Sequence, residues 1–252
     1  MKLHVVFALL LATAAAAAAQ SPAHTTVPWS YDGKTGPAVW SRLDSAYAAC
    51  SKGRAQSPIN IRRARLNKAL APIEFHYLAS SATITNNGSF FQLTPKTGGY
   101  IVANGTRYEL TELDFHSPSE SAINGVYADL DVELVHQSAE GKLVILEIRF
   151  ERDQDIPNAL LATIADHLPQ LAGRQNKIDD LLNPAGFLPA DRGYWTYSGS
   201  LTTPPCTEGV QWYVLEQDMT LSRAQYRAFT STFRLNSRPL QDTHGRRIEA
   251  NE

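Results

Sequence analysis

Residues 107–116 read Arg-Tyr-Glu-Leu-Thr-Glu-Leu-Asp-Phe-His, and this stretch decides what kind of structure the chain forms. Side chains of an extended strand point alternately to its two faces, so Glu112, Asp114 and His116 share one face. The leucine and phenylalanine between them point to the opposite face, which is therefore apolar. The pattern predicts a β-strand with one face on a hydrophobic core and titratable groups on the other.

A second stretch, Ala128 to His136, repeats this alternation. Asp131, Glu133 and Val135 share one face, while His136 falls on the opposite, apolar face. If the two strands pair, their carboxylates converge around the single imidazole of His116. The alternative interpretation is a polar sheet face that is simply exposed to water.

The rest of the chain extends this sheet. Four further β-branched or aromatic segments, bounded by Asn-Gly, Gly-Gly or Pro-containing turns, also predict strands. These segments are Ser81–Asn86, Phe90–Leu93, Leu143–Phe150 and Gln211–Leu215. Helical signals are fewer: apolar residues at helical spacing follow Pro157, and Ser222 with Gln225 resembles a capping box. We expect a mostly β fold with helices at the periphery of a large sheet.

The composition limits the classes of partner. The chain has 252 residues, with 23 Lys plus Arg against 25 Asp plus Glu and a net charge of −2. This balance supplies no overall basic field for a nucleic-acid backbone or an anionic membrane surface. We therefore expect neither nucleic-acid binding nor a membrane span.

The first 19 residues are typical of a cleavable secretory signal. Lys2 is followed by a short apolar stretch and an alanine run that ends at Ala19. A membrane anchor, the alternative, needs about 20 strongly apolar residues, and this stretch is shorter. The prediction is a signal peptide over 1–19, one domain over 20–252, and a secreted or periplasmic mature protein.

Cys50 and Cys206 are the only cysteines. In an exported chain such a pair forms a disulfide more often than a metal site. The tripeptides at 87–89 and 104–106 match the N-glycosylation pattern, which matters only in a eukaryotic secretory route.

Two long motifs and several shorter ones point to a family. The long ones are Gln56-Ser57-Pro58-Ile59-Asn60-Ile61 and the run from Tyr194 to Cys206, Tyr-Trp-Thr-Tyr-Ser-Gly-Ser-Leu-Thr-Thr-Pro-Pro-Cys. The shorter ones include Trp29-Ser30-Tyr31, Phe115-His116-Ser117-Pro118-Ser119-Glu120, Glu133-Leu134-Val135-His136 and Asn236-Ser237-Arg238-Pro239-Leu240-Gln241. In this order they resemble the α-carbonic anhydrases over nearly all of the mature chain.

The resemblance implies a fold and a reaction. The fold would be a central, mostly antiparallel sheet of about ten strands with its site in a conical cleft. A bridge between Cys50 and Cys206 would match one in secreted members. The family hydrates carbon dioxide reversibly to bicarbonate and a proton, on a zinc ion held by three histidines.

The ligand positions of this chain differ from that pattern. Alignment through Phe115-His116 and Leu134-Val135-His136 places Asp114, His116 and Glu133 at the three zinc positions, so that only His116 remains a histidine. His136 matches a histidine that is not a ligand. An Asp/His/Glu set would leave a bound Zn²⁺ formally neutral and would weaken its effect on the pKa of bound water. The acidic group Glu112, Asp114, Asp131 and Glu133 would instead suit a harder ion such as manganese, calcium or magnesium.

The surroundings of these positions are altered only in part. Glu112 stands where the family usually has a glutamine, and Asp131 matches the family's acidic partner of the third ligand. The resemblance assigns Thr202 and Glu120 to the pair that orients the hydroxide. It assigns Val135, Ile145, Leu201 and Trp212 to the apolar wall for carbon dioxide. Ser89 replaces the histidine that shuttles protons in fast members.

These observations favour a secreted family member that lacks ordinary zinc-dependent hydration and acts as a noncatalytic binding or structural protein. The alternative is a carbonic anhydrase that works with an unusual Asp/His/Glu metal site. In the first case the ligand or protein partner is unknown, and zinc is weakly bound or absent. In the second, the partners are carbon dioxide and bicarbonate, and another divalent metal takes the place of zinc.

Overall fold

The computed structural model of the chain describes residues 27–153 and 156–251. The signal peptide predicted over 1–19 lies outside this range. Among the described helices, none combines the length and apolar character that crossing a membrane requires.

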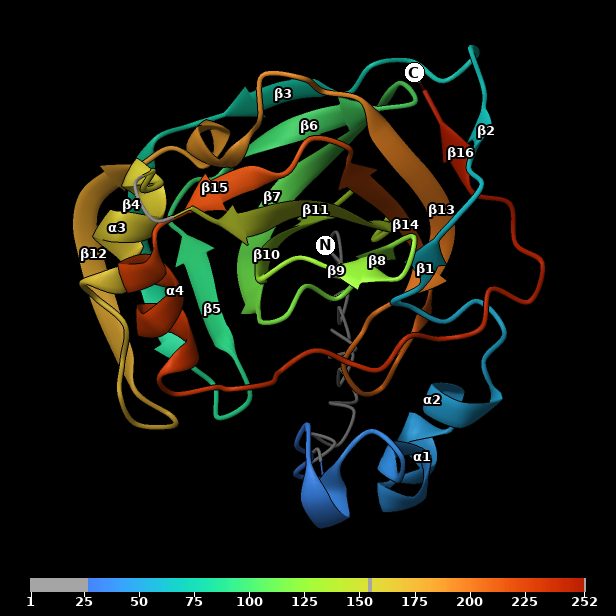
Figure 1. The fold of residues 1–252 in the computed structure, drawn as a ribbon, viewed down its shortest axis with the longest axis horizontal. Helices are drawn as coiled ribbons and strands as arrows, with labels where there is room; N and C mark the ends of the chain where they lie inside the picture. Colours follow the sequence, from blue (N-terminus) through green and yellow to red (C-terminus); the bar gives the residue numbers. More distant parts are fainter. Residues whose placement is uncertain (1–26, 154–155, 252) are drawn as a thin grey trace, which may run out of the picture.

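One large sheet organises the molecule (Figure 1). Ten of its strands follow one another in the order β12, β4, β5, β7, β10, β11, β14, β13, β16 and β2. Their bounds are β12 Gln175–Leu182, β4 Ser80–Asn86, β5 Phe91–Pro95, β7 Thr106–His116, β10 Leu130–Gln137, β11 Leu143–Arg152, β14 Glu208–Leu215, β13 Tyr194–Ser200, β16 Glu249–Ala250 and β2 Arg65–Leu66. Antiparallel pairs predominate; β11–β14 and β16–β2 are parallel. The predicted fold class and all six predicted strands are confirmed.

Shorter strands complete the sheets. β3 (Glu74–Tyr77) and β6 (Gly99–Ala103) pair beside β7, and β15 (Met219–Leu221) pairs with β11. β1 (Asn60–Ile61), β8 (Ala122–Ile123) and β9 (Val126–Tyr127) form a separate three-stranded sheet. Asn104 and Gly105 form the two-residue turn between β6 and β7. Both have positive φ, as the tight hairpin turn for Asn-Gly requires.

Helices lie at the periphery of the sheet, as Figure 1 shows for α3 and α4 beside β12 and β4. The helical segments are η1 Gly33–Thr35, α1 Trp40–Leu43, η2 Ser45–Tyr47, α2 Ala49–Lys52, α3 Ala159–Ala165, η3 Pro184–Phe187 and α4 Arg223–Thr230. Asn158 caps α3, accepting hydrogen bonds from the amides of residues 160 and 161. Ser222 and Gln225 form the predicted capping box at α4.

The two faces of the central strands bury different cores. Leu113, Phe115 and Leu134 belong to the larger hydrophobic cluster together with residues of α3 and α4. Val135, on the other face, belongs to a second apolar cluster. His136 lies on the face of the larger cluster, where its Nε2 and the Tyr77 hydroxyl are 3.0 Å apart. The predicted alternation is therefore confirmed, and it directs the acidic residues away from the main core.

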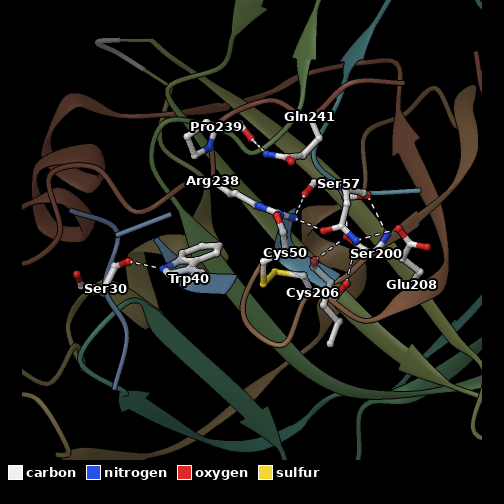
Figure 2. The surroundings of a disulfide bond; sticks show 12 residues. Ser30, Trp40, Cys50, Ser57, Ser200, Cys206, Glu208, Arg238, Pro239 and Gln241 are labelled. Atoms are coloured by element: carbon white, nitrogen blue, oxygen red, sulfur yellow. Dashed lines mark hydrogen bonds between the residues drawn. A yellow bond between two sulfur atoms is a disulfide. The ribbon is translucent and has the colours of Figure 1, made fainter. Parts of the chain in front are cut away.

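The Cys50–Cys206 disulfide is present and joins α2 to the loop after β13. Arg238 lies beside the disulfide (Figure 2). Its Nη1 donates to Gln56 Oε1 at 2.9 Å and to the Ser57 carbonyl at 2.7 Å. Nη2 donates to the Cys50 carbonyl at 2.9 Å. We call this set the Arg238 cage. It holds residues 50–57 against the segment that carries Arg238, while the disulfide and a bond from Gln56 Nε2 to the Cys206 carbonyl join the same residues to the loop after β13.

Candidate functional site

Pairing between β7 and β10 assembles the site. In this register Asp114 lies opposite Glu133, and His116 lies opposite Asp131. All four side chains share a face of the sheet and are less than one-tenth exposed. The predicted convergence of carboxylates around His116 is thus confirmed, and the interpretation as a water-exposed polar face is wrong.

His116 is held in one protonation state. Its Nδ1 lies 2.7 Å from the carbonyl oxygen of Asn236, which can only accept, so Nδ1 carries the proton. Burial lowers the pKa of His116 to about 4. The imidazole is therefore neutral at physiological pH, and its Nε2 keeps a lone pair for a ligand.

Two carboxylates complete a compact group of donors. One ligand atom each from His116, Glu120 and Glu133 lies within 4.8 Å of the other two, and all three residues are buried. Glu120 Oε2 accepts the amide of Arg238 at 3.0 Å. Oε1 of Glu120 and Oε1 of Glu133 have no hydrogen-bond partner in the described chain. These free oxygens are available to a proton or a cation.

A second layer of acid lies behind Glu133. Asp131 Oδ2 accepts the amide of Glu120 at 2.6 Å, and Glu147 Oε1 accepts the amide of Ser121 at 3.2 Å. The other carboxylate oxygens, Asp131 Oδ1 and Glu147 Oε2, have no hydrogen-bond partner within the described residues. Both side chains are fully buried. The site therefore holds more buried carboxylate oxygens than the chain supplies donors for.

Asp114 stands apart from the donor group. Its Oδ1 accepts a hydrogen bond from Gln92 Nε2 at 3.1 Å. Burial and the neighbouring charge of Glu112 raise its pKa well above the ordinary value. The group formed by His116 and Glu133 thus includes Glu120 rather than Asp114.

The electrostatics of the site favour neutral acids. Burial is the largest cause of the raised pKa values of Glu120, Asp131 and Glu133, and their mutual repulsion adds to it. The Tyr31 hydroxyl is also buried, with no hydrogen-bond partner among the residues that the structure describes, and its pKa is raised by burial and by these acids. Such a cluster holds protons or binds a positively charged ligand.

The predicted apolar wall is assembled next to these acids. Val135, Ile145 and Trp212 belong to one buried cluster, and Leu201 packs against it. Thr202, which is also buried, forms a side-chain hydrogen bond that lowers the pKa of Glu120. Leu201, which packs against this cluster, is the chain neighbour of Thr202.

Sequence reasoning missed several residues of the site. Glu147 follows Ile145 by two positions, so alternation on this strand places it on the same face, and this signal was available. Tyr31 and Asn236 lie in motifs that were noted only for their resemblance. Their contacts with His116 join segments far apart in the chain, and no local pattern predicts them.

Known proteins share this fold and sequence. The sequence model of the eukaryotic-type carbonic anhydrase family matches residues 35–252. A carbonic anhydrase of Klebsiella pneumoniae is 38% identical over 221 residues, covering 86% of this chain and 89% of that protein. The α-carbonic anhydrase of Thermovibrio ammonificans, solved with the inhibitor sulfanilamide, has a TM-score of 0.85 and 32% identity, covering 89% of this chain and 99% of that one.

A differently named protein is also similar. Dioscorin complexed with ascorbate has a TM-score of 0.82 and 30% identity, covering 88% of this chain and 97% of that one. The sheet, the site and these similarities agree, and the chain belongs to the eukaryotic-type carbonic anhydrase family.

Proposed function

We propose that this protein is an exported α-carbonic anhydrase family member that lacks ordinary zinc-dependent hydration of carbon dioxide and serves as a noncatalytic binding or structural protein. The observation that carries the proposal is the donor set of the cleft. One neutral imidazole, His116, stands among buried carboxylates where the family pattern has three imidazoles.

The residues present do not fit the family's zinc ion. By their resemblance to the family's motifs, Asp114 and Glu133 take two of the three histidine positions. Three neutral imidazoles would leave the metal its full charge, whereas two carboxylates cancel it and remove the drive to ionise bound water. An Asp side chain is also shorter than a histidine, and Asp114 is engaged by Gln92. We therefore derive no zinc-dependent step for this chain.

A binding role agrees with the rest of the scaffold. The apolar wall and the Thr202–Glu120 pair persist beside the altered donor set. Dioscorin, which has the same fold, is known in complex with ascorbate, so the fold also holds a small organic molecule. The disulfide and the predicted signal support a location outside the cytoplasm, where disulfides persist.

Stopped-flow hydration of carbon dioxide tests the proposal. The mature, disulfide-bonded protein is assayed in chelator, with added zinc and with added manganese. We expect rates equal to that of the buffer in all three conditions. A metal-dependent rate well above buffer that Glu133→Ala abolishes would overturn the proposal.

One observation favours a second function, hydration on another divalent metal. His116, Glu120 and Glu133 bring an imidazole and two carboxylates into a compact group, and such oxygen-rich sets suit harder ions than zinc. Manganese binding, measured by calorimetry or by electron paramagnetic resonance, is the first requirement of this function, and the hydration rate with manganese separates it from noncatalytic binding. This second function requires that the wild type retains manganese and the variant Asp114→Ala plus Glu133→Ala does not. Equal retention would exclude it.

A further inference from the structure

A basic groove lies at the end of the sheet, away from the acidic site. It has a volume of about 540 Å³, within the range typical of small-molecule sites. Its lining includes five arginines: Arg62, Arg63, Arg65, Arg246 and Arg247. Asp and Glu are absent from its lining in the part of the chain that the structure describes. Four strands, β11, β14, β13 and β16, separate β2 at the groove from β10 at the acidic site.

Strand pairing creates this concentration of charge. The parallel pair of β2 with β16 places Arg65 beside Glu249, so the segment 62–65 meets the segment 243–248 although about 180 residues of chain lie between them. Figure 1 shows these segments side by side at one edge of the molecule, from β1 to β2 and leading into β16. The chain as a whole has a net charge of −2. The groove is therefore a local reversal of the overall charge.

Hydrogen bonds to backbone carbonyls hold the side chain of Arg246 in place in the groove. Its Nη1 donates to the Ser198 carbonyl at 2.8 Å, and its Nη2 donates to the Gln56 carbonyl at 2.6 Å. Its Nε donates to the Thr243 carbonyl at 2.9 Å. Carbonyl oxygens bear no net charge, so these three bonds fix the Arg246 guanidinium without pairing it with a carboxylate, and Glu208 and Asp242 act on its charge only from beyond ion-pair distance.

The other arginines keep their donors for a ligand. Within the described residues, the arginines in ion pairs are Arg107, Arg149, Arg152 and Arg247. Arg62, Arg63 and Arg65 are exposed and have no such carboxylate partner there. Arg247 has only a 3.5 Å contact with Glu249, and this pair is weak because the arginine is two-thirds exposed.

We propose that this groove binds a small organic molecule that carries two phosphate groups. Guanidinium groups bind phosphate through paired, charge-assisted hydrogen bonds. Each phosphate monoester carries about −1.5 to −2 charges near neutral pH, so two of them match the four solvent-facing arginines. A single phosphate would leave half of the groove's charge without a partner, and a long polyanion would extend beyond it.

Calorimetric titration of the mature wild-type protein tests the proposal. The probes are fructose bisphosphate, fructose monophosphate and fructose. We expect saturable binding of the bisphosphate, at least about tenfold weaker binding of the monophosphate and none of the free sugar. Binding should weaken between about 20 mM and about 200 mM salt because added salt screens exposed charges.

A matched pair of variants locates the site. Arg62→Gln plus Arg65→Gln should weaken bisphosphate binding at least about tenfold. The control, Arg223→Gln plus Arg227→Gln on α4, removes the same charge elsewhere and should change the binding less than about twofold. Arg247→Gln repeats the test from the other segment should the first variant fold poorly.

Three results would overturn the proposal. They are equal binding of the monophosphate and bisphosphate, equal weakening by the α4 variant, and tight binding of heparin or a DNA oligonucleotide without binding of the bisphosphate. The last would assign the surface to a polymer. None of these measurements depends on the state of the acidic cleft.

Discussion

The Arg238 cage and the acidic site are adjacent buried polar regions, yet they differ in how far their charged groups are hydrogen-bonded. In the cage the guanidinium donates to three oxygens, and Figure 2 shows this network closing around the disulfide. In the site, Glu120, Asp131, Glu133 and Glu147 each have an oxygen without a hydrogen-bond partner among the described residues. Glu120 joins the two regions through the backbone amide of Arg238.

This difference in hydrogen bonding indicates a structural role for the cage and a binding role for the acidic site. A buried network whose groups are all paired stabilises one conformation, whereas a buried carboxylate oxygen without a donor costs free energy unless it is protonated or binds a ligand. The cage is therefore expected to be sensitive to any loss of a partner. The acidic site is expected to gain stability when its charge is removed, and to gain a function when its ligands are replaced.

The largest expected effect comes from completing the family's donor set. Asp114→His plus Glu133→His should create a site of three imidazoles around His116. We expect tight zinc binding and a hydration rate at least about 100-fold above wild type, because zinc lowers the pKa of bound water from about 15.7 to about 7. Metal analysis after dialysis and stopped-flow assays measure both results.

The single variant Asp114→His is the control, and with Glu133 unchanged it should gain much less. Adding Glu112→Gln to the double variant should strengthen zinc binding, because it removes a carboxylate that faces residue 114. Absence of tight zinc from a folded double variant would mean that residues 114 and 133 do not occupy the family's ligand positions.

The second effect concerns the cage. Arg238→Met keeps much of the side-chain volume but leaves Gln56 Oε1 and the carbonyls of Cys50 and Ser57 without their donor. We expect the free energy of unfolding to fall by about 3–5 kcal/mol, the range for breaking a buried charged network. Urea unfolding monitored by fluorescence and circular dichroism gives this value.

The matched control is Arg227→Met on the exposed side of α4, which should change stability by less than about 0.5 kcal/mol. A loss below about 1 kcal/mol for Arg238→Met would show that the cage contributes no more than an ordinary hydrogen bond. The cage would then contribute too little to stability to be distinguished from the acidic site by its hydrogen bonding.

The fold was predictable from the sequence to the extent that it depends on local patterns. Alternation located the central strands, and Ser222 with Gln225 located the start of α4. Short edge strands such as β2 and β16 carry too few residues for a pattern, and their parallel pairing depends on distant segments. The basic groove could not be predicted from the net charge of the whole chain. Its arginines lie in two segments, 62–65 and 246–247, that only the fold brings together.

The candidate site was predictable in its composition and less so in its geometry. The convergence of acids around His116 followed from strand alternation. The inclusion of Glu120 in the donor group depends on the loop after β7 and on its bond to Arg238, which no local pattern encodes. Glu147 was overlooked although alternation from Ile145 places it on the same face.

The smallest expected effect tests the acidic site by pH. Glu133→Gln removes a buried carboxyl whose pKa is raised, first by burial and then by Asp131. A carboxyl with a raised folded-state pKa stabilises the fold below its unfolded value, near 4.5, and loses that contribution as pH rises towards the folded value. The variant should therefore exceed wild type by about 1–2 kcal/mol at pH near 8, and the difference should disappear near pH 4.

Urea unfolding in the presence of chelator, across this pH range, measures the difference free of any bound metal. His116 and His136, whose pKa values are lowered to about 4 and about 3, are present in both proteins, so their contributions cancel. Glu140→Gln is the control, because the pKa shift of Glu140 has the opposite sign: a hydrogen bond from Ser138 lowers the pKa of this exposed carboxyl. The control variant should therefore gain no stability over wild type as pH rises. Destabilisation by Glu133→Gln at pH near 8 would mean that the Glu133 carboxylate already has a favourable partner. The acidic site would then resemble the cage, and its free oxygens would no longer indicate a site for a proton or cation.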